Sequence, residues 1–124
     1  MTMQRQNLGK WGEERAIREL ERRGYAILAR RYRTRHGEID IVADDGGTIV
    51  FVEVKAREQA DCGGAAEAVT IHKQRRLASM AVDYLTRNRV TNRPCRFDVV
   101  AIDGQKLTVY ASAFEVAESP GRWR

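Results

Sequence analysis

The run TIVFVEVK, from Thr48 to Lys55, limits the possible folds more than any other part of the chain. Apart from its two charged residues it is β-branched or aromatic at every position. Such a composition is typical of a strand covered on both faces, because both sets of alternating side chains are then buried. We therefore expect Thr48–Lys55 to form the centre of a sheet.

Helix and strand patterns on either side of this run predict an α/β protein. Residues Leu8–Arg23 are rich in helix formers and end before Gly24, the residue type that most often follows a helix. A second helix is expected from a cap at Thr70 to about Arg87, because apolar residues recur there at helical spacing. Further strands are predicted in YAILARRYR (25–33), GEIDIVADDGG (37–47), CRFDVVAI (95–102) and KLTVYASAF (106–114).

Three segments carry more detailed expectations. The first of these strands should be short and lead into a positively charged, solvent-facing turn. In the second, apolar and other residues alternate from 38 to 43, which predicts a regular strand before a turn at 44–47. Residues Ala56 to Ala66 lack a periodic apolar pattern and are expected to form a mobile loop that could close on a ligand.

Length and composition set the class of protein. The 124 residues suit one domain, expected to span 1–124 with a core of about 8–114 and a tail at 115–124. The formal charge of +5 favours polyanionic partners. Since no apolar run is long enough to span a membrane and no secretory signal is visible, we expect a cytoplasmic protein without a membrane partner. Cys62 and Cys95 lack the spacing of a zinc site and are expected to be reduced.

Two charged residues of the central strand point to a site. Glu53 and Lys55 share one face with Phe51, because successive side chains of a strand alternate. Their simplest interpretation is a salt bridge at the strand end. Antiparallel pairing across the preceding turn would also bring Asp40 near Glu53. Two carboxylates at such a short distance repel each other unless a cation lies between them, and their oxygens suit Mg²⁺ or Mn²⁺.

A third carboxylate lies on the first predicted helix. At roughly 100° per residue, Glu13 projects between Ile17 and Leu20 in the apolar stripe, whereas Glu14 points away. An acidic residue in such a stripe can also cap the helix or pair with an arginine. Together with Asp40 and Glu53, Glu13 is taken as a candidate site residue.

These residues stand in segments that resemble a known nuclease superfamily. GEE (12–14), GEID (37–40) and FVEVK (51–55) resemble the PD-(D/E)xK, or restriction-endonuclease-like, pattern, with Ile39 in place of its proline. More narrowly, GKWGEERA, RRGYAILARRYRTRHGEIDIVA, FVEVKAR and RFDVVAI resemble the YraN-like family, itself similar to archaeal Holliday-junction resolvases. The resemblance implies a core of helix, three strands, helix and strand, with a mixed central sheet flanked by helices.

The same resemblance implies a function and roles for four residues. Asp40 and Glu53 would bind Mg²⁺ or Mn²⁺, and Glu13 would bind it directly or through water. Lys55 would orient the attacking water or stabilise developing phosphate charge. The chain would then be a metal-dependent endonuclease hydrolysing phosphodiester bonds of structured or branched DNA. By analogy with the resolvases it would act as a homodimer.

Basic residues outside this set are candidates for contacts to nucleic acid. Phosphate contacts are usually made by arginine and lysine, although charge on a solvated face often serves solubility alone. The candidates are Arg31, Arg33, Arg35, Lys73 and Arg76.

Two other functions stay open, namely a non-catalytic module that binds nucleic acid and has a structural acidic cluster, and a protein-interaction domain. Phosphate-loop, dinucleotide-binding and Ser/His/Asp patterns are absent, which excludes nucleotide-cofactor chemistry and acyl transfer. Asp98, acidic in an apolar strand, is expected to form a structural ion pair with Arg96 or another arginine.

Overall fold

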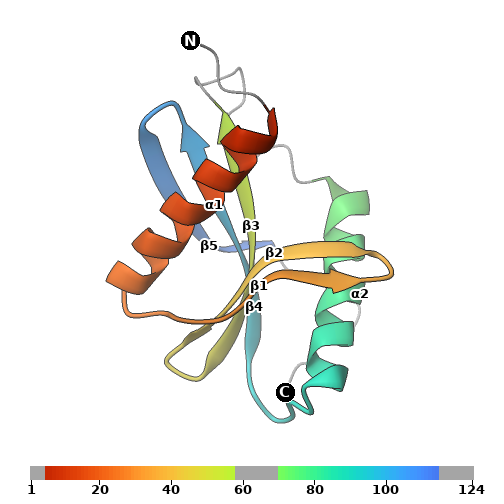
Figure 1. The fold of residues 1–124 in the computed structure, drawn as a ribbon. Helices are drawn as coiled ribbons and strands as arrows, with labels where there is room; N and C mark the ends of the chain where they lie inside the picture. The colour runs from red at the N-terminus through yellow and green to blue at the C-terminus, as the bar shows by residue number, and fades with distance from the viewer. Residues whose placement is uncertain (1–4, 58–69, 115–124) are drawn as a thin grey trace.

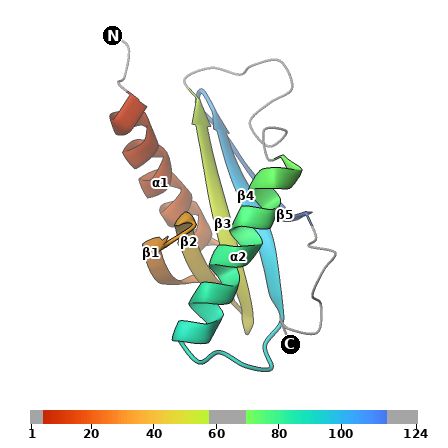
Figure 2. The ribbon, with the colours of Figure 1, turned by 90° about the vertical axis from the view of Figure 1, so that its right-hand side faces the viewer.

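A computed structural model describes residues 5–57 and 70–114 of the chain. Its described residues fold into a five-stranded sheet in the order β1-β2-β3-β4-β5, with a helix on each face (Figures 1 and 2). β3 and β4 are parallel, and the other neighbouring strands are antiparallel. The elements are α1 (Arg5–Arg22), β1 (Ala26–Thr34), β2 (Gly37–Asp45), β3 (Thr48–Arg57), α2 (Ile71–Arg87), β4 (Cys95–Asp103) and β5 (Lys106–Phe114).

This arrangement confirms the predicted α/β class and the mixed sheet flanked by helices. β3 lies at the centre of the sheet, with α1 over one face and α2 over the other (Figure 2). Val50 and Val52 contribute to the cluster under α1, whereas Ile49 and Phe51 contribute to the cluster under α2. Both sets of alternating side chains are buried, as the apolar composition of this strand predicted.

Helix α2 connects the two parallel strands and covers one face of the sheet. Parallel neighbours need a crossover connection, usually a helix, because a tight turn cannot join them. The Thr70 side chain accepts a hydrogen bond from the Lys73 N–H at 3.2 Å, so the predicted cap is confirmed. Leu77, Met80 and Tyr84 are buried at helical spacing against the sheet.

Helix α1 approaches the other face closely at Gly12. A Cβ atom at Gly12 would lie 2.7 Å from the Cβ of Ala56 in β3, too close for any residue but glycine without a shift of the helix. Ala16, Ile17 and Leu20 continue the buried stripe along α1. The close approach places Glu13, the next residue, beside the end of β3.

The regular alternation predicted for β2 is wrong at Asp40. Ile41 and Ala43 pack under α1, but Ile39 packs against α2, so the side-chain alternation reverses between Ile39 and Ile41. The pairing of β2 with β3 ends at Ile41 and Val52. Beyond this point β2 keeps only its pairing with β1 among the described strands, and the twisted hairpin extends across α2 (Figure 1).

The basic residues after position 29 belong to strand β1 rather than to a turn, which corrects the prediction for this segment. β1 continues to Thr34, and the turn is formed by Arg35 and His36. The Thr34 hydroxyl accepts a hydrogen bond from the His36 N–H at 2.9 Å. Arg31 has a φ of 49°, a left-handed conformation that side chains other than glycine seldom adopt.

Several other predictions have simpler outcomes. A loop was predicted for Ala56 to Ala66, but residues 56 and 57 belong to β3. The rest of that segment, including Cys62, lies outside the described residues, and so does the tail at 115–124. Asp98 is buried and its carboxylate accepts a hydrogen bond from Arg96 Nε at 3.0 Å, so the predicted ion pair is confirmed. Neither described helix has the length and apolar content needed to cross a membrane.

Candidate functional site

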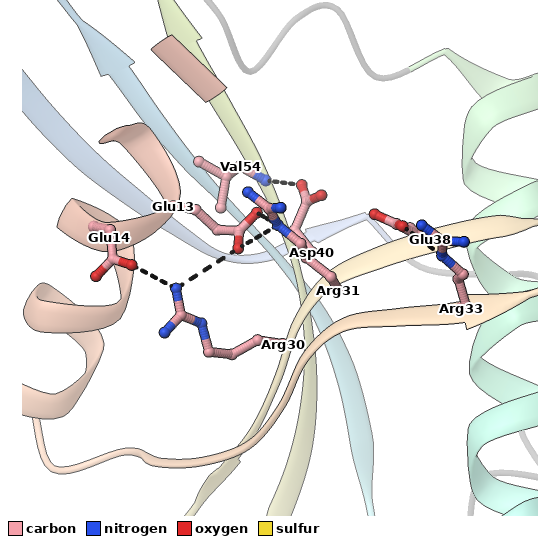
Figure 3. A network of polar contacts seen from close by, with 8 residues as sticks. All are labelled: Glu13, Glu14, Arg30, Arg31, Arg33, Glu38, Asp40 and Val54. Carbon is pink, nitrogen blue, oxygen red and sulfur yellow. Dashed lines mark hydrogen bonds and ion pairs between the residues drawn. The ribbon is translucent and has the colours of Figure 1, made fainter. Parts of the chain in front are cut away.

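Asp40 lies where β2 separates from β3. The backbone pairing of the two strands ends at Ile41 and Val52, and the Asp40 carboxylate accepts a hydrogen bond from the Val54 N–H at 2.8 Å (Figure 3). Hydrogen bonds from backbone amides to a carboxylate are charge-assisted and fix its position. The side chain is therefore held in the angle between the two strands.

Glu53 stands on β3 next to this angle. It is buried, with 8% of its surface exposed, and forms an ion pair with Lys73 Nζ of α2 at 2.5 Å. Lys55 Nζ lies 3.5 Å from the same carboxylate oxygen. The salt bridge expected between Glu53 and Lys55 is thus present, but Lys73 is the nearer partner.

The pKa of Asp40 reflects its surroundings. Burial, followed by the negative charge of Glu53, raises the pKa of Asp40 from 3.8 to about 7, although the Val54 N–H opposes this rise. The structure thus brings Asp40 and Glu53 together, as antiparallel pairing predicted. A carboxyl group with this pKa is only partly ionised near neutral pH, and a bound cation would favour the charged form.

The two lysines differ in their protonation. Burial and the adjacent Lys73 ammonium lower the pKa of Lys55, although Glu53 opposes the change. For Lys73, burial lowers the pKa, but the hydrogen bond to Glu53 and further interactions outweigh it and the pKa is raised. Lys73 therefore holds its proton more firmly, and Lys55 loses its proton more readily than an ordinary lysine.

Glu13 lies on the other side of Asp40 and is bound by an arginine of β1. Its buried carboxylate accepts hydrogen bonds from Arg31 Nε at 3.0 and 3.2 Å (Figure 3). Arg30 Nη2 is 3.9 Å from Glu13 and 2.7 Å from Glu14. Arg31, which was expected to contact nucleic acid, thus faces the acidic site. The alternative expectation for Glu13, that it pairs with an arginine, is met by this contact.

Two surface hollows meet at Asp40. One, of about 280 Å³, is lined by Asp40, Glu53, Lys73 and Arg76, with Leu77 and Met80 among its apolar residues. The other, of about 230 Å³, is lined by Glu13, Arg31, Asp40 and Val54, among others. Asp40 and Glu38 line both hollows. A ligand in either hollow would therefore meet the Asp40 carboxylate.

The donor atoms fit a divalent metal at two of the three predicted ligands. Asp40 and Glu53 supply hard carboxylate oxygens that face one cleft. Within residues 5–57 and 70–114, however, no three Asp, Glu, His or Cys side chains gather in a group suited to a metal. Glu13 lines the other hollow and is bound there by Arg31. Water would have to complete the coordination of a metal bound by Asp40 and Glu53.

The remaining basic candidates lie at different distances from this site. Arg76 lines the cleft with Lys73. Arg33 is largely exposed and forms an ion pair with Glu38 at 3.0 Å (Figure 3). Arg35 is exposed in the β1–β2 turn. Their contact with nucleic acid stays a prediction.

Two polar residues of the cleft, His36 and Glu38, were not among the candidates. Glu38 lines both hollows, and His36 lines the cleft that contains Glu53. His36 could be a proton carrier next to the GEID segment, but a single histidine in a loop is more often a polar surface residue, and both residues flank Gly37 shortly before Asp40, at the tip of a hairpin. Because the hairpin twists toward α2, this tip becomes part of the cleft wall, which local patterns do not reveal.

The comparisons with known proteins agree along most of the chain. A family model described as "Uncharacterised protein family UPF0102" matches residues 12–102. A "UPF0102 protein" of Roseiflexus castenholzii is 50% identical over 124 residues, covering 96% of this chain and 100% of the relative. One from Ralstonia pickettii is 48% identical over 112 residues, covering 87% of this chain and 90% of the relative. The matched segment contains all four of the predicted catalytic residues.

Proposed function

This chain belongs to the uncharacterised protein family UPF0102, a PD-(D/E)xK nuclease-like family, and from that premise we propose that it is a metal-dependent nuclease. The membership confirms the resemblance to the YraN-like family. The proposed reaction is hydrolysis of phosphodiester bonds in structured or branched DNA. Since the family description names no activity, the proposal rests on the side chains of the site.

The observation that carries the proposal is the pairing of Asp40 and Glu53 in one cleft. Burial and the charge of Glu53 raise the pKa of Asp40 to about 7, so the pair resists carrying two negative charges. Structural carboxylates are normally neutralised by arginine, lysine or several hydrogen-bond donors. Asp40 forms no ion pair with any basic side chain in the described part of the chain. Mg²⁺ or Mn²⁺ bound by both carboxylates would remove this conflict.

The side chains around the pair suit phosphodiester hydrolysis. A bound divalent metal would polarise the scissile phosphate and lower the pKa of a water molecule. Lys55 Nζ would orient the attacking water, and its lowered pKa leaves a larger fraction of this amine neutral and able to accept a proton from that water. Lys73 and Arg76 line the same cleft and would contact phosphate oxygens. Glu13 would contribute from the second hollow.

Cleavage assays with labelled DNA test this proposal. Duplex, single-stranded, flapped and four-way substrates are incubated with Mg²⁺ or Mn²⁺ and either wild type, Asp40→Asn, Glu53→Gln or Lys55→Met. We expect the cleavage rate of each site variant to fall on the order of 100-fold or more, as it does when a group that acts in the transition state is removed. Glu14→Gln is the matched control, because Glu14 lies beside Glu13 but lines neither hollow.

Metal binding gives a measurement independent of activity. Titration calorimetry with Mn²⁺ should show a site in wild type and in Glu14→Gln that is lost in Asp40→Asn. Circular dichroism must show that each variant is folded. Cleavage that needs no metal, or that persists in all three site variants, would indicate a contaminating nuclease and contradict the proposal.

A second function is favoured by the ion pairs of the other two carboxylates. Glu53 is bound by Lys73 and Glu13 by Arg31, as expected for an acidic cluster with a structural purpose. The chain would then be a module that binds nucleic acid without cutting it. Salt-sensitive DNA binding, with neither Mn²⁺ binding nor cleavage of any of the four substrates, would favour this function.

A further inference from the structure

A third hollow lies on α1, outside the carboxylate site. It has a volume of about 340 Å³, larger than either hollow at Asp40. It shares no lining residue with them, being formed by the outer side of α1 and the start of β5. Its lining residues are Trp11, Arg15, Arg18, Glu19, Arg22 and Leu107.

The aromatic residue and the three arginines form one stripe on α1. Trp11, Arg15, Arg18 and Arg22 follow one another at intervals of four, three and four residues, which places them within about 60° around the helix axis at about 100° per residue. The buried residues of α1, including Glu13, lie on another side of the helix. The stripe and the carboxylate site therefore face different directions from the same helix.

The charge of the stripe is positive. The only acidic residue of the hollow, Glu19, is bound by Arg22 at 2.6 Å and by Arg23 at 2.7 Å. These hydrogen bonds lower the pKa of Glu19 to about 2, so it stays ionised and two arginines neutralise it. Arg18 is exposed and forms no ion pair with a described residue. An anion in the hollow would therefore meet a net excess of positive charge.

Trp11 gives the stripe an aromatic end. The Arg15 guanidinium lies 5.1 Å from the centre of the Trp11 ring, and Arg15 Nη2 donates a hydrogen bond to the Gln105 backbone oxygen at 3.1 Å. This contact ties Arg15 to the β4–β5 turn and holds it against the ring. Trp11 itself is partly buried, packs against the apolar cluster under α1 and lines the hollow beside Arg15.

We propose that this stripe binds one strand of a DNA duplex, with Arg15, Arg18 and Arg22 on its phosphates and Trp11 against a sugar. Arg15 and Arg22 are seven positions apart, which corresponds to a rise of about 10 Å along the helix. Over that length one strand of a duplex carries about three phosphates, which matches the three arginines. The chain would thus hold a second DNA segment away from the carboxylate site.

Salt-dependent binding tests the proposal. Anisotropy of a labelled DNA oligonucleotide is measured between roughly 50 and 200 mM salt for wild type and for Arg18→Ala/Arg22→Ala. We expect the variant to bind on the order of 10-fold more weakly at low salt, with the salt slope reduced by about two, since each phosphate contact contributes about 0.9. Arg87→Ala is the matched control, an exposed arginine in the last turn of α2 that pairs with Asp83 as Arg22 pairs with Glu19.

Tryptophan emission tests the aromatic contact. The chain has two tryptophans, Trp11 and Trp123, so Trp123→Phe leaves Trp11 as the only tryptophan. DNA should quench the emission of this variant, and the quenching should be lost on adding Arg18→Ala/Arg22→Ala. Wild-type affinity and salt slope in the double variant, or unchanged Trp11 emission at saturating DNA, would overturn the proposal.

Failure of this proposal is distinct from failure of the nuclease. The stripe shares no side chain with the carboxylate site, so Asp40→Asn should retain DNA binding that depends on Arg18 and Arg22. If the chain cuts DNA but the double variant binds normally, the stripe proposal alone is wrong. If binding depends on the stripe and no cleavage occurs, the stripe proposal holds and the nuclease proposal fails.

Discussion

Replacing Asp40 with asparagine should make the protein more stable at alkaline pH. Asparagine keeps an oxygen that can accept the hydrogen bond from the Val54 N–H, made at 2.8 Å in the wild type. It removes the negative charge that lies beside Glu53. Since folding confines this charge in a partly buried position, the folded state should gain from losing it.

The size of the gain follows from the pKa. A rise from 3.8 to about 7 corresponds to about 4 kcal/mol between the two protonation states. Solvent in the open cleft screens part of this energy, so we expect Asp40→Asn to raise the free energy of unfolding at alkaline pH by about 2 to 4 kcal/mol. The folded state holds the proton of Asp40 more tightly than the unfolded state. The free energy of unfolding of the wild type should therefore fall as pH rises from about 4 to about 7.

Urea unfolding at pH 4 and pH 8, without divalent metal, measures the effect. Asp40→Asn and wild type should have similar stability at pH 4, and the variant should be more stable at pH 8. Asp44→Asn is a control of opposite sign, because the hydrogen bond from Arg93 and that from the Gly47 N–H lower the pKa of Asp44. A stability difference between Asp40→Asn and wild type that does not change with pH would refute the reasoning.

Two further predictions concern packing and the buried ion pair. Gly12→Ala should lower the free energy of unfolding in urea by about 1 to 3 kcal/mol, because its Cβ would meet that of Ala56. Gly9→Ala should raise it by up to about 1 kcal/mol, since nothing lies within 4 Å of a Cβ at Gly9. Equal effects of the two substitutions would contradict the close approach of α1 at Gly12. Lys73→Met should lower the free energy of unfolding at pH 8 by about 2 kcal/mol, because it leaves the buried Glu53 without its nearer partner, and an unchanged urea midpoint would contradict this.

The elements of the fold could be predicted because their signals are local. The uninterrupted apolar run of β3 predicts a central strand, and the helical spacing of Leu77, Met80 and Tyr84 predicts the face that α2 buries. The proximity of Asp40 and Glu53 follows from one hairpin turn between neighbouring strands. Each of these features depends on residues close together in the chain or on a single pairing.

The details of the site depend on contacts across the fold. Lys73 is nearer to Glu53 than Lys55 is, because a crossover helix brings it back over β3, and no local spacing fixes that distance. Arg31 meets Glu13 because β1 adopts a left-handed conformation at this residue, where the basic composition predicted an exposed turn. Tertiary packing decides both, so the sequence predicted that Asp40 and Glu53 lie close together, but not that Lys73 is the nearest partner of Glu53 or that Arg31 is the partner of Glu13.

The three carboxylates of the site differ in how their charge is balanced. Glu13 has Arg31 and Glu53 has Lys73, whereas Asp40 forms no ion pair with a basic side chain among the described residues. Its charge must then be met by a proton below about pH 7 or by a cation above it. Proton and metal would compete for one carboxylate, so metal binding should strengthen over the same pH range in which the metal-free protein loses stability. A metal that bound equally well across that range would have to be held elsewhere than at Asp40.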